Sequence, residues 1–135
     1  RAIDALCSDH HPLGADAKRM PFPQAAPGMA GVETLLPLSL AAVRDGRMSL
    51  ERAIASLTIE PAQILGLPLG TLAPGAAADL CIVDPEQCWT PDATTLISGG
   101  HNTPFLGRSL RGRVTHTLLG GRIVHQLDAH TRHAP

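Results

Sequence analysis

Aromatic residues are scarce in this 135-residue chain, which has two Phe, one Trp and no Tyr. It also lacks an excess of charge of one sign, because 11 Lys and Arg face 12 Asp and Glu, for a net charge of −1. A protein that binds nucleic acids needs a basic groove or aromatic side chains on which bases stack. The composition therefore argues against a nucleic-acid partner.

Long hydrophobic runs are missing too. The longest stretch, from Leu35 to Val43, is interrupted by Pro37 and Ser39, and a helix that crosses a membrane needs about 20 apolar residues. We therefore expect no membrane-spanning segment. Hydrophobic residues still make up 44% of the chain, which is typical of a globular domain with a core and not of a disordered chain.

Cysteine is infrequent and unpaired. Cys7, Cys81 and Cys88 are odd in number and form no Cys-x-x-Cys pair. This pattern favours reduced thiols over a disulfide framework or a zinc knuckle. We therefore expect a cytoplasmic protein.

The most informative stretch lies near the N-terminus. Residues 2–7 form a short apolar run with one acid, Asp4, and predict a buried strand over residues 2–8. The run stops at Ser8-Asp9-His10-His11, before the break at Pro12. In α/β barrels the chemistry lies at the carboxyl ends of the strands. Asp9 is therefore a candidate to hold a metal or to move a proton. Because Arg1 leads almost directly into this strand, we expect the chain to be the C-terminal piece of a longer polypeptide.

A proline- and glycine-rich loop is expected over residues 9–32, followed by three helices. The first covers 33–45, with Thr34 as its cap and Pro37 in its first turn. The second begins after Ser49. The third is capped by Thr58, ends at Gly66 and is expected to face the core through three side chains, those of Ala62, Ile64 and Leu65.

The second half has the pattern of a small β unit. Residues 70–78 read as a linker, and residues 79–84 as a strand that ends at Pro85. Residues 113–119 have the alternating pattern of a second strand. Gly120-Gly121 is expected to form a two-residue hairpin turn that leads into a third strand over 122–125. We divide the chain into residues 1–67, residues 68–126 and a flexible tail over 127–135.

Three motifs carry a resemblance to a known family: Ser8-Asp9-His10-x-Pro12, Pro27-Gly28-x-x-Gly31-x-Glu33-Thr34 and Asn102-Thr103-Pro104-Phe105-x-Gly107. Together they resemble dihydroorotases, the zinc-dependent cyclic amidohydrolases of pyrimidine biosynthesis. The resemblance implies an α/β fold. Residues 1–67 would be the C-terminal part of a (β/α)8 barrel, its last strand and the following helices. Residues 68–126 would be part of a small β-sandwich.

The resemblance also implies roles. Asp9 would ligate zinc and accept the proton of the attacking water, and the backbone of Ala26, Pro27 and Gly28 would contact the substrate. Leu13 stands where the family usually has a substrate-binding histidine, which makes His11 the candidate for that contact. The family's other zinc ligands precede the last barrel strand. The 135 residues alone are therefore expected to be inactive and to hold no zinc tightly.

The function implied is the reversible cyclisation of N-carbamoyl-L-aspartate to L-dihydroorotate. Two alternatives stay open. One is a non-catalytic dihydroorotase-like subunit that serves as a scaffold for aspartate carbamoyltransferase. The other is a different cyclic amidohydrolase, such as an allantoinase. Because a barrel strand without its neighbours leaves unpaired edges, a homo-oligomer is also expected.

Overall fold

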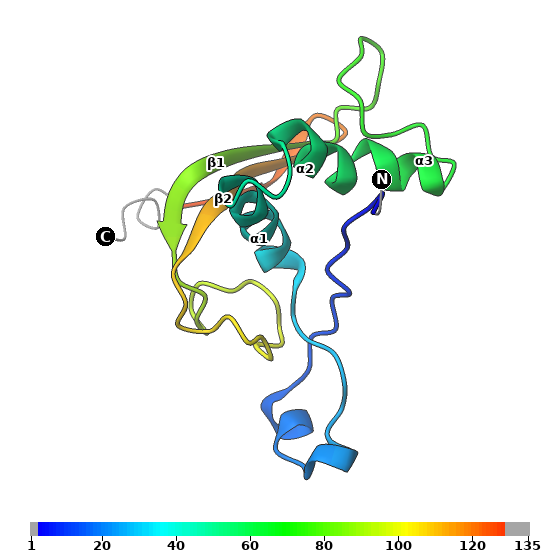
Figure 1. Cartoon of the computed structure of the whole chain (residues 1–135). Helices are drawn as coiled ribbons and strands as arrows, with labels where there is room; N and C mark the ends of the chain where they lie inside the picture. The colour runs from blue at the N-terminus through cyan, green and yellow to red at the C-terminus, as the bar shows by residue number, and fades with distance from the viewer. Residues whose placement is uncertain (1–2, 129–135) are drawn as a thin grey trace.

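The computed structural model describes residues 3–128. It contains three helices, α1 (Val32–Arg44), α2 (Leu50–Leu57) and α3 (Ile59–Ile64). They lie beside an antiparallel sheet in the order β1-β2-β3, made of β1 (Leu80–Trp89), β2 (Leu110–Leu119) and β3 (Arg122–Gln126) (Figure 1). A long loop with two 3-10 turns, η1 (Ala15–Lys18) and η2 (Phe22–Gln24), extends away from the sheet. The α/β character expected from the sequence is confirmed.

The expected strand over residues 2–8 was wrong for the part that the structure describes, because residues 3–8 form no strand. A strand exists through ladder hydrogen bonds to a neighbour, and this segment finds no partner strand among the described residues. Its backbone is tied instead by Leu6, whose N–H donates to the carbonyl of Ser56 at 2.9 Å. An isolated parallel bridge then joins His10 to Met29.

Helix α1 packs against β2 and forms the centre of the fold. Gly112 permits this contact, because a Cβ there would lie 2.5 Å from Cδ1 of the buried Leu40. Trp89 stabilises the same region by donating its indole N–H to the carbonyl of Gly112 at 3.1 Å. Two details of the expected helix were wrong. Thr34 lies inside the first turn, where its hydroxyl donates to the carbonyl of Gly31, and Pro37 lies in the helix interior.

The two shorter helices confirm one expected cap and contradict the other. Ser49 caps α2, because its Oγ accepts a hydrogen bond from the N–H of Arg52 at 3.2 Å. Thr58 does not cap α3, since its hydroxyl donates back to the carbonyl of Ile54 at 2.7 Å. Ala62 is buried as expected. Ile64 and Leu65 are 64% and 71% exposed, so their placement in the core was wrong.

The sheet follows the expected hairpin but has a longer first strand. Gly120 and Gly121 have φ of +56° and +77°, the left-handed values that a two-residue turn requires. The strand does not end at Pro85, because β1 continues to Trp89 across an irregularity. There the carboxylate of Asp84 accepts hydrogen bonds from the N–H groups of Glu86 and Gln87, and proline is tolerated at such bulges.

Pairing at the C-terminal end of the sheet extends past β3. Leu127 is buried, and its N–H donates to the carbonyl of Thr115 at 2.8 Å. Most of the expected flexible tail, residues 129–135, lies outside the described residues. No helix within residues 3–128 is long and apolar enough to cross a membrane.

Candidate functional site

Asp9 lies where the extended N-terminal segment meets the long loop. Its side chain is exposed, and its φ of +43° is left-handed. Among the described residues, no other residue except glycine has a positive φ. Such a conformation costs a residue with a side chain on the order of 1–3 kcal/mol and concentrates at functional sites. The backbone at Asp9 thus has a conformation that ordinarily favours glycine.

His10 holds the start of α1. Its Nδ1 accepts hydrogen bonds from the N–H groups of Gly31 and Val32, at 3.1 and 3.2 Å. These are two of the N–H groups that a helix leaves without an internal partner. The ring therefore does the capping that the sequence assigned to Thr34. A ring nitrogen accepts a hydrogen bond only when it carries no proton, so Nδ1 of His10 is occupied by its hydrogen bonds to the start of α1.

His11 lies against the loop that the sequence assigned to the substrate. Its N–H donates to the carbonyl of Met29 at 2.8 Å, and its ring packs on Gly28. A Cβ on Gly28 would approach the Cβ of His11 to 2.7 Å, and Gly28 has a φ of +93°. The structure thus brings together two of the predicted substrate-binding residues, His11 and Gly28.

The loop over Ala26–Gly28 is held by a lysine at the end of η1. Lys18 donates from its ammonium to the carbonyl of Ala26 and to that of Gly28, the latter at 2.8 Å. The N–H of Ala26 in turn donates to the carbonyl of Ala17 at 3.1 Å. Nothing in the local sequence distinguishes Lys18 from a solvated lysine, because both of its partners are backbone atoms.

Asn102 joins the same loop from the other half of the chain. Its Nδ2 donates to the carbonyls of His11 and Gly28, at 3.0 and 3.3 Å, and its Oδ1 accepts from the N–H of Leu13 at 2.7 Å. The neighbouring Gly100 lies so close to Leu13 that a Cβ would meet its backbone nitrogen at 2.4 Å. In the sequence, Asn102 was distinguished only as the first residue of a motif that carries the family resemblance.

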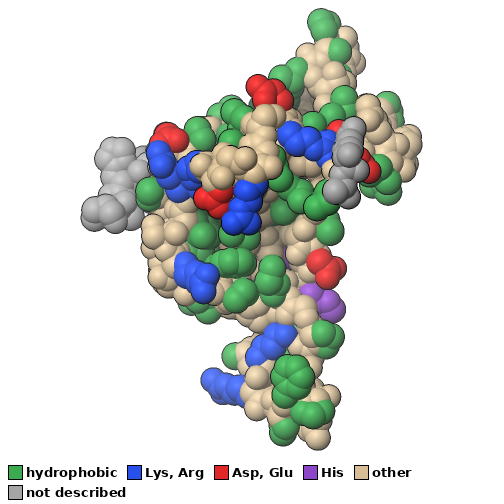
Figure 2. All heavy atoms as spheres, in the orientation of Figure 1, with side chains coloured by type: hydrophobic (Ala, Val, Ile, Leu, Met, Phe, Trp, Pro, Cys, Tyr) green, Lys and Arg blue, Asp and Glu red, His purple; other side chains and the backbone are tan. Residues whose placement is uncertain are grey.

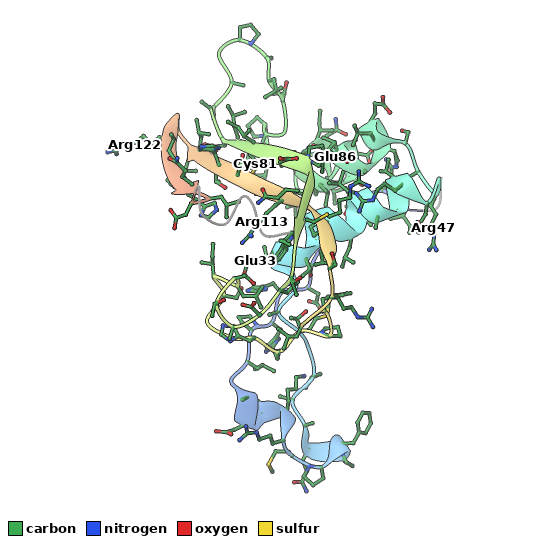
Figure 3. All side chains as sticks on the ribbon, turned by 90° about the vertical axis from the view of Figure 1, so that its left-hand side faces the viewer. Glu33, Arg47, Cys81, Glu86, Arg113 and Arg122 are labelled. Carbon is green, nitrogen blue, oxygen red and sulfur yellow. The ribbon has the colours of Figure 1, made fainter. Side chains whose placement is uncertain are left out.

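Glu33 and Arg113 anchor the loop that carries Asn102. The Glu33 carboxylate accepts hydrogen bonds from the N–H groups of Ile97 and Ser98 at 3.0–3.1 Å. Arg113 lies nearby (Figure 3), 4.7 Å over the Trp89 ring. Burial lowers the pKa of Arg113, and the negative charge of Glu33 opposes that shift. The arginine stays charged at neutral pH, so it can balance the glutamate.

An open hollow of about 600 Å³ lies where the two loops meet. It is lined by residues of both, among them Lys18, Gly28, Met29, His101 and Asn102. The lining of the hollow therefore comes partly from the predicted substrate loop and partly from the loop between β1 and β2.

The described residues do not form a metal site by themselves. Within residues 3–128 there is no group of three or more His, Cys, Asp or Glu side chains that could hold a metal ion. Zinc sites take at least three protein ligands, and here Asp9 offers one carboxylate while His10 has one ring nitrogen engaged with α1. Any zinc bound next to Asp9 would need donors from elsewhere.

Comparison with known proteins defines the class. A model of the Amidohydrolase family matches residues 2–124, so the chain belongs to the amidohydrolase family. Among curated relatives, it is 48% identical over 126 residues to the dihydroorotase of Anaeromyxobacter dehalogenans. It is 44% identical over 126 residues to the dihydroorotase of Syntrophus aciditrophicus. The alignments cover 93% of this chain but 29% and 30% of those proteins. The resemblance found in the motifs is confirmed.

Solved structures that superpose on this chain include a dihydropyrimidinase and an L-hydantoinase. Dihydropyrimidinase from Brevibacillus agri superposes with a TM-score of 0.83 at 26% identity, over 92% of this chain and 28% of that one. L-hydantoinase from Arthrobacter aurescens superposes with a TM-score of 0.80 at 36% identity, over 92% of this chain and 29% of that one. The fold of this chain is therefore one that such enzymes contain.

Proposed function

We propose that this chain is the C-terminal part of a dihydroorotase, a hydrolase that interconverts N-carbamoyl-L-aspartate and L-dihydroorotate in pyrimidine biosynthesis. The observation that carries the proposal is the 48% identity to a dihydroorotase over 93% of the chain. The chain spans about 29% of the length of that relative, so most of the active site would come from the rest of the protein. As a soluble metabolic enzyme it would act in the cytoplasm on a small molecule.

Asp9 would act at the reacting atoms. Its exposed carboxylate can accept the proton of the attacking water and pass it to the amide nitrogen that leaves. In the complete protein it would also be one ligand of zinc, which lowers the pKa of a bound water towards about 7. Because the described residues hold no group of three or more side chains that could bind a metal ion, the chain alone should be inactive.

The loop over Ala26–Gly28 would bind the substrate through its backbone. Gly28 lines the hollow between the two loops, and His11 packs directly on it. A substrate held there would lie beside the segment from Asp9 to Leu13. His11 would then be placed to take the role of the family's missing histidine, towards the carboxylate of the substrate.

A second candidate is the non-catalytic scaffold for aspartate carbamoyltransferase. Leu13 favours it, because its side chain cannot donate a hydrogen bond and stands where the family usually has a histidine. Losing one hydrogen bond to a charged group costs about 1.5–3 kcal/mol, which is on the order of a ten- to a hundredfold loss in substrate binding.

The test is turnover by the complete, zinc-loaded protein. L-dihydroorotate, allantoin and hydantoin are supplied in parallel, and the ring-opened product is measured. Hydrolysis of dihydroorotate well above the other two supports the proposal, and preference for allantoin makes the protein an allantoinase. No turnover, together with co-purification of aspartate carbamoyltransferase, supports the scaffold.

A further inference from the structure

Three of the five backbone N–H and C=O groups of Ala26–Gly28 are hydrogen-bonded within the chain. Ala26 uses both groups, since its N–H donates to the carbonyl of Ala17 and its carbonyl accepts from Lys18. The carbonyl of Gly28 accepts from both Lys18 and Asn102. Two groups have no hydrogen-bond partner within residues 3–128: the carbonyl of Pro27 and the N–H of Gly28.

Those two groups belong to one peptide unit, the bond between Pro27 and Gly28. A peptide unit is planar and rigid, so the direction in which it points is set by the backbone on either side. On one side lies the carbonyl of Ala26, held by Lys18. On the other lies the carbonyl of Gly28, held by Lys18 and Asn102. The two side chains thus hold the free peptide unit from both flanks.

Asn102 also holds a second segment, the one that contains His11 and Leu13. Its Oδ1 and Nδ2 bind the backbone of Leu13 and His11, and its own carbonyl accepts from the N–H of Ala30 at 3.1 Å. These partners lie 72 to 91 positions away in the sequence, so Asn102 joins the small β unit to the loop through both its side chain and its backbone carbonyl. The segment from Asp9 to Leu13 and the loop over Ala26–Gly28 therefore keep a fixed relation.

We propose that Lys18 and Asn102 are positioning residues that hold the Pro27–Gly28 peptide unit in the orientation in which it meets the substrate. Neither residue has to touch the substrate. The proposal rests on the proposed function for the identity of that substrate, a cyclic amide whose ring carries the amide N–H and C=O groups that a free peptide unit can bind.

The first measurement is amide hydrogen exchange and does not depend on turnover. The variants are Lys18→Met, which keeps the length of the side chain without a donor, and Asn102→Asp, which keeps an acceptor but removes the Nδ2 donors. Arg19→Met is the matched control, since Arg19 is an exposed cation in the same loop whose side chain pairs with Asp16 at 3.5 Å. We expect exchange at Ala26, Ala30 and His11 to be at least tenfold faster in the two variants and unchanged in the control.

The second measurement separates positioning from general stability. With L-dihydroorotate, KM should rise about tenfold in Lys18→Met and in Asn102→Asp, with kcat within about twofold and the thermal midpoint close to that of the wild type. A KM that stays at the wild-type value while exchange becomes faster overturns the proposal, because the two residues would then be merely structural. Unchanged exchange overturns it as well.

The two proposals fail in different ways. If the wild-type protein hydrolyses no cyclic amide, the proposed function fails, and exchange alone decides whether Lys18 and Asn102 hold the loop. If the wild type hydrolyses dihydroorotate and both variants match it in KM and in exchange, only the positioning fails.

Discussion

Glycines without room for a side chain mark where the loops approach each other. Gly28 supports the ring of His11, and Gly31 passes so close to Ser8 that a Cβ would lie 2.8 Å from its carbonyl oxygen. Gly100 approaches the backbone of Leu13 in the same way. The site is therefore built from backbone contacts between three segments, and side chains such as Asn102 fasten them.

Gly28→Ala should destabilise this arrangement. Alanine would have to adopt a φ of +93° and would bring its Cβ to 2.7 Å from that of His11. Strain of this kind costs about 1–3 kcal/mol, which urea denaturation would measure as a lower midpoint. Gly14→Ala is the control, because Gly14 has a φ of −66° and nothing within 4 Å. Equal midpoints for the two variants would contradict the close approach of Gly28 and His11.

The turn from Asp92 to Thr95 should be sensitive to acid, because the carboxylate of Asp92 holds it together. This carboxylate accepts hydrogen bonds from the hydroxyl and the N–H of Thr94 and from the N–H of Thr95, which hold its pKa below the ordinary value of 3.8. A lowered pKa means that these bonds stabilise the fold above about pH 3.8 and are lost as the pH falls through the lower value. The amide shift of Thr94, followed by NMR, should show a midpoint below 3.8 and no such step in Asp92→Asn. A midpoint above 3.8 would contradict the bonding.

The sequence predicted some site residues and could not predict others. Asp9, His11 and Gly28 belong to short motifs, so their grouping could be inferred from a resemblance. The roles of Lys18 and Asn102 depend on backbone atoms of other segments, up to 91 positions away for Asn102. No local pattern encodes such contacts. Whether Asp9 and the loop act on a substrate stays a prediction.

At the scale of elements, the sequence predicted some local features correctly and missed others, such as the expected caps at Thr34 and Thr58. The Ser49 cap and the Gly120-Gly121 turn depend on residues a few positions apart, and both form. The strand expected near the N-terminus and the buried face of α3 depend on distant partners. In the described residues these partners are absent, so residues 3–8 form no strand and Ile64 is exposed.

Ser49→Ala should weaken α2 measurably. The substitution removes the side-chain acceptor of the Arg52 N–H, which is 3.2 Å away, and loss of such a cap costs about 1 kcal/mol. The free energy of unfolding from urea titration would show it. Ser109→Ala, at an exposed serine just before β2, should change that free energy by less than about 0.5 kcal/mol. A Ser49→Ala variant as stable as the wild type would rule out the cap.

The whole molecule exposes more surface than its size requires. Its accessible area is 9090 Å², whereas a compact monomer of 14.1 kDa would expose about 6,700 Å². Figure 2 shows hydrophobic side chains over both the helical part and the lower loop. Phe22, Leu65 and Leu72 are 94%, 71% and 84% exposed. Large exposed apolar areas usually mark surfaces that another polypeptide covers.

The isolated 135-residue chain should therefore self-associate. Sedimentation velocity would show a weight-average coefficient that rises with concentration, because burial of apolar side chains favours association. Leu65→Gln should reduce the effect, and Asp16→Asn, a change at a polar exposed site, should not. A coefficient that is independent of concentration and fits a monomer would contradict the expectation.

The central claim is that the carboxylate of Asp9 takes part in the hydrolysis of a cyclic amide. The most direct test is the rate of dihydroorotate hydrolysis by the complete, zinc-loaded protein with Asp9→Asn, beside Asp16→Asn as the control from the same exposed loop. We expect the first variant to lose turnover by at least a thousandfold while its fold is retained, and the second to match the wild type. Equal rates for Asp9→Asn and the wild type would remove Asp9 from the site.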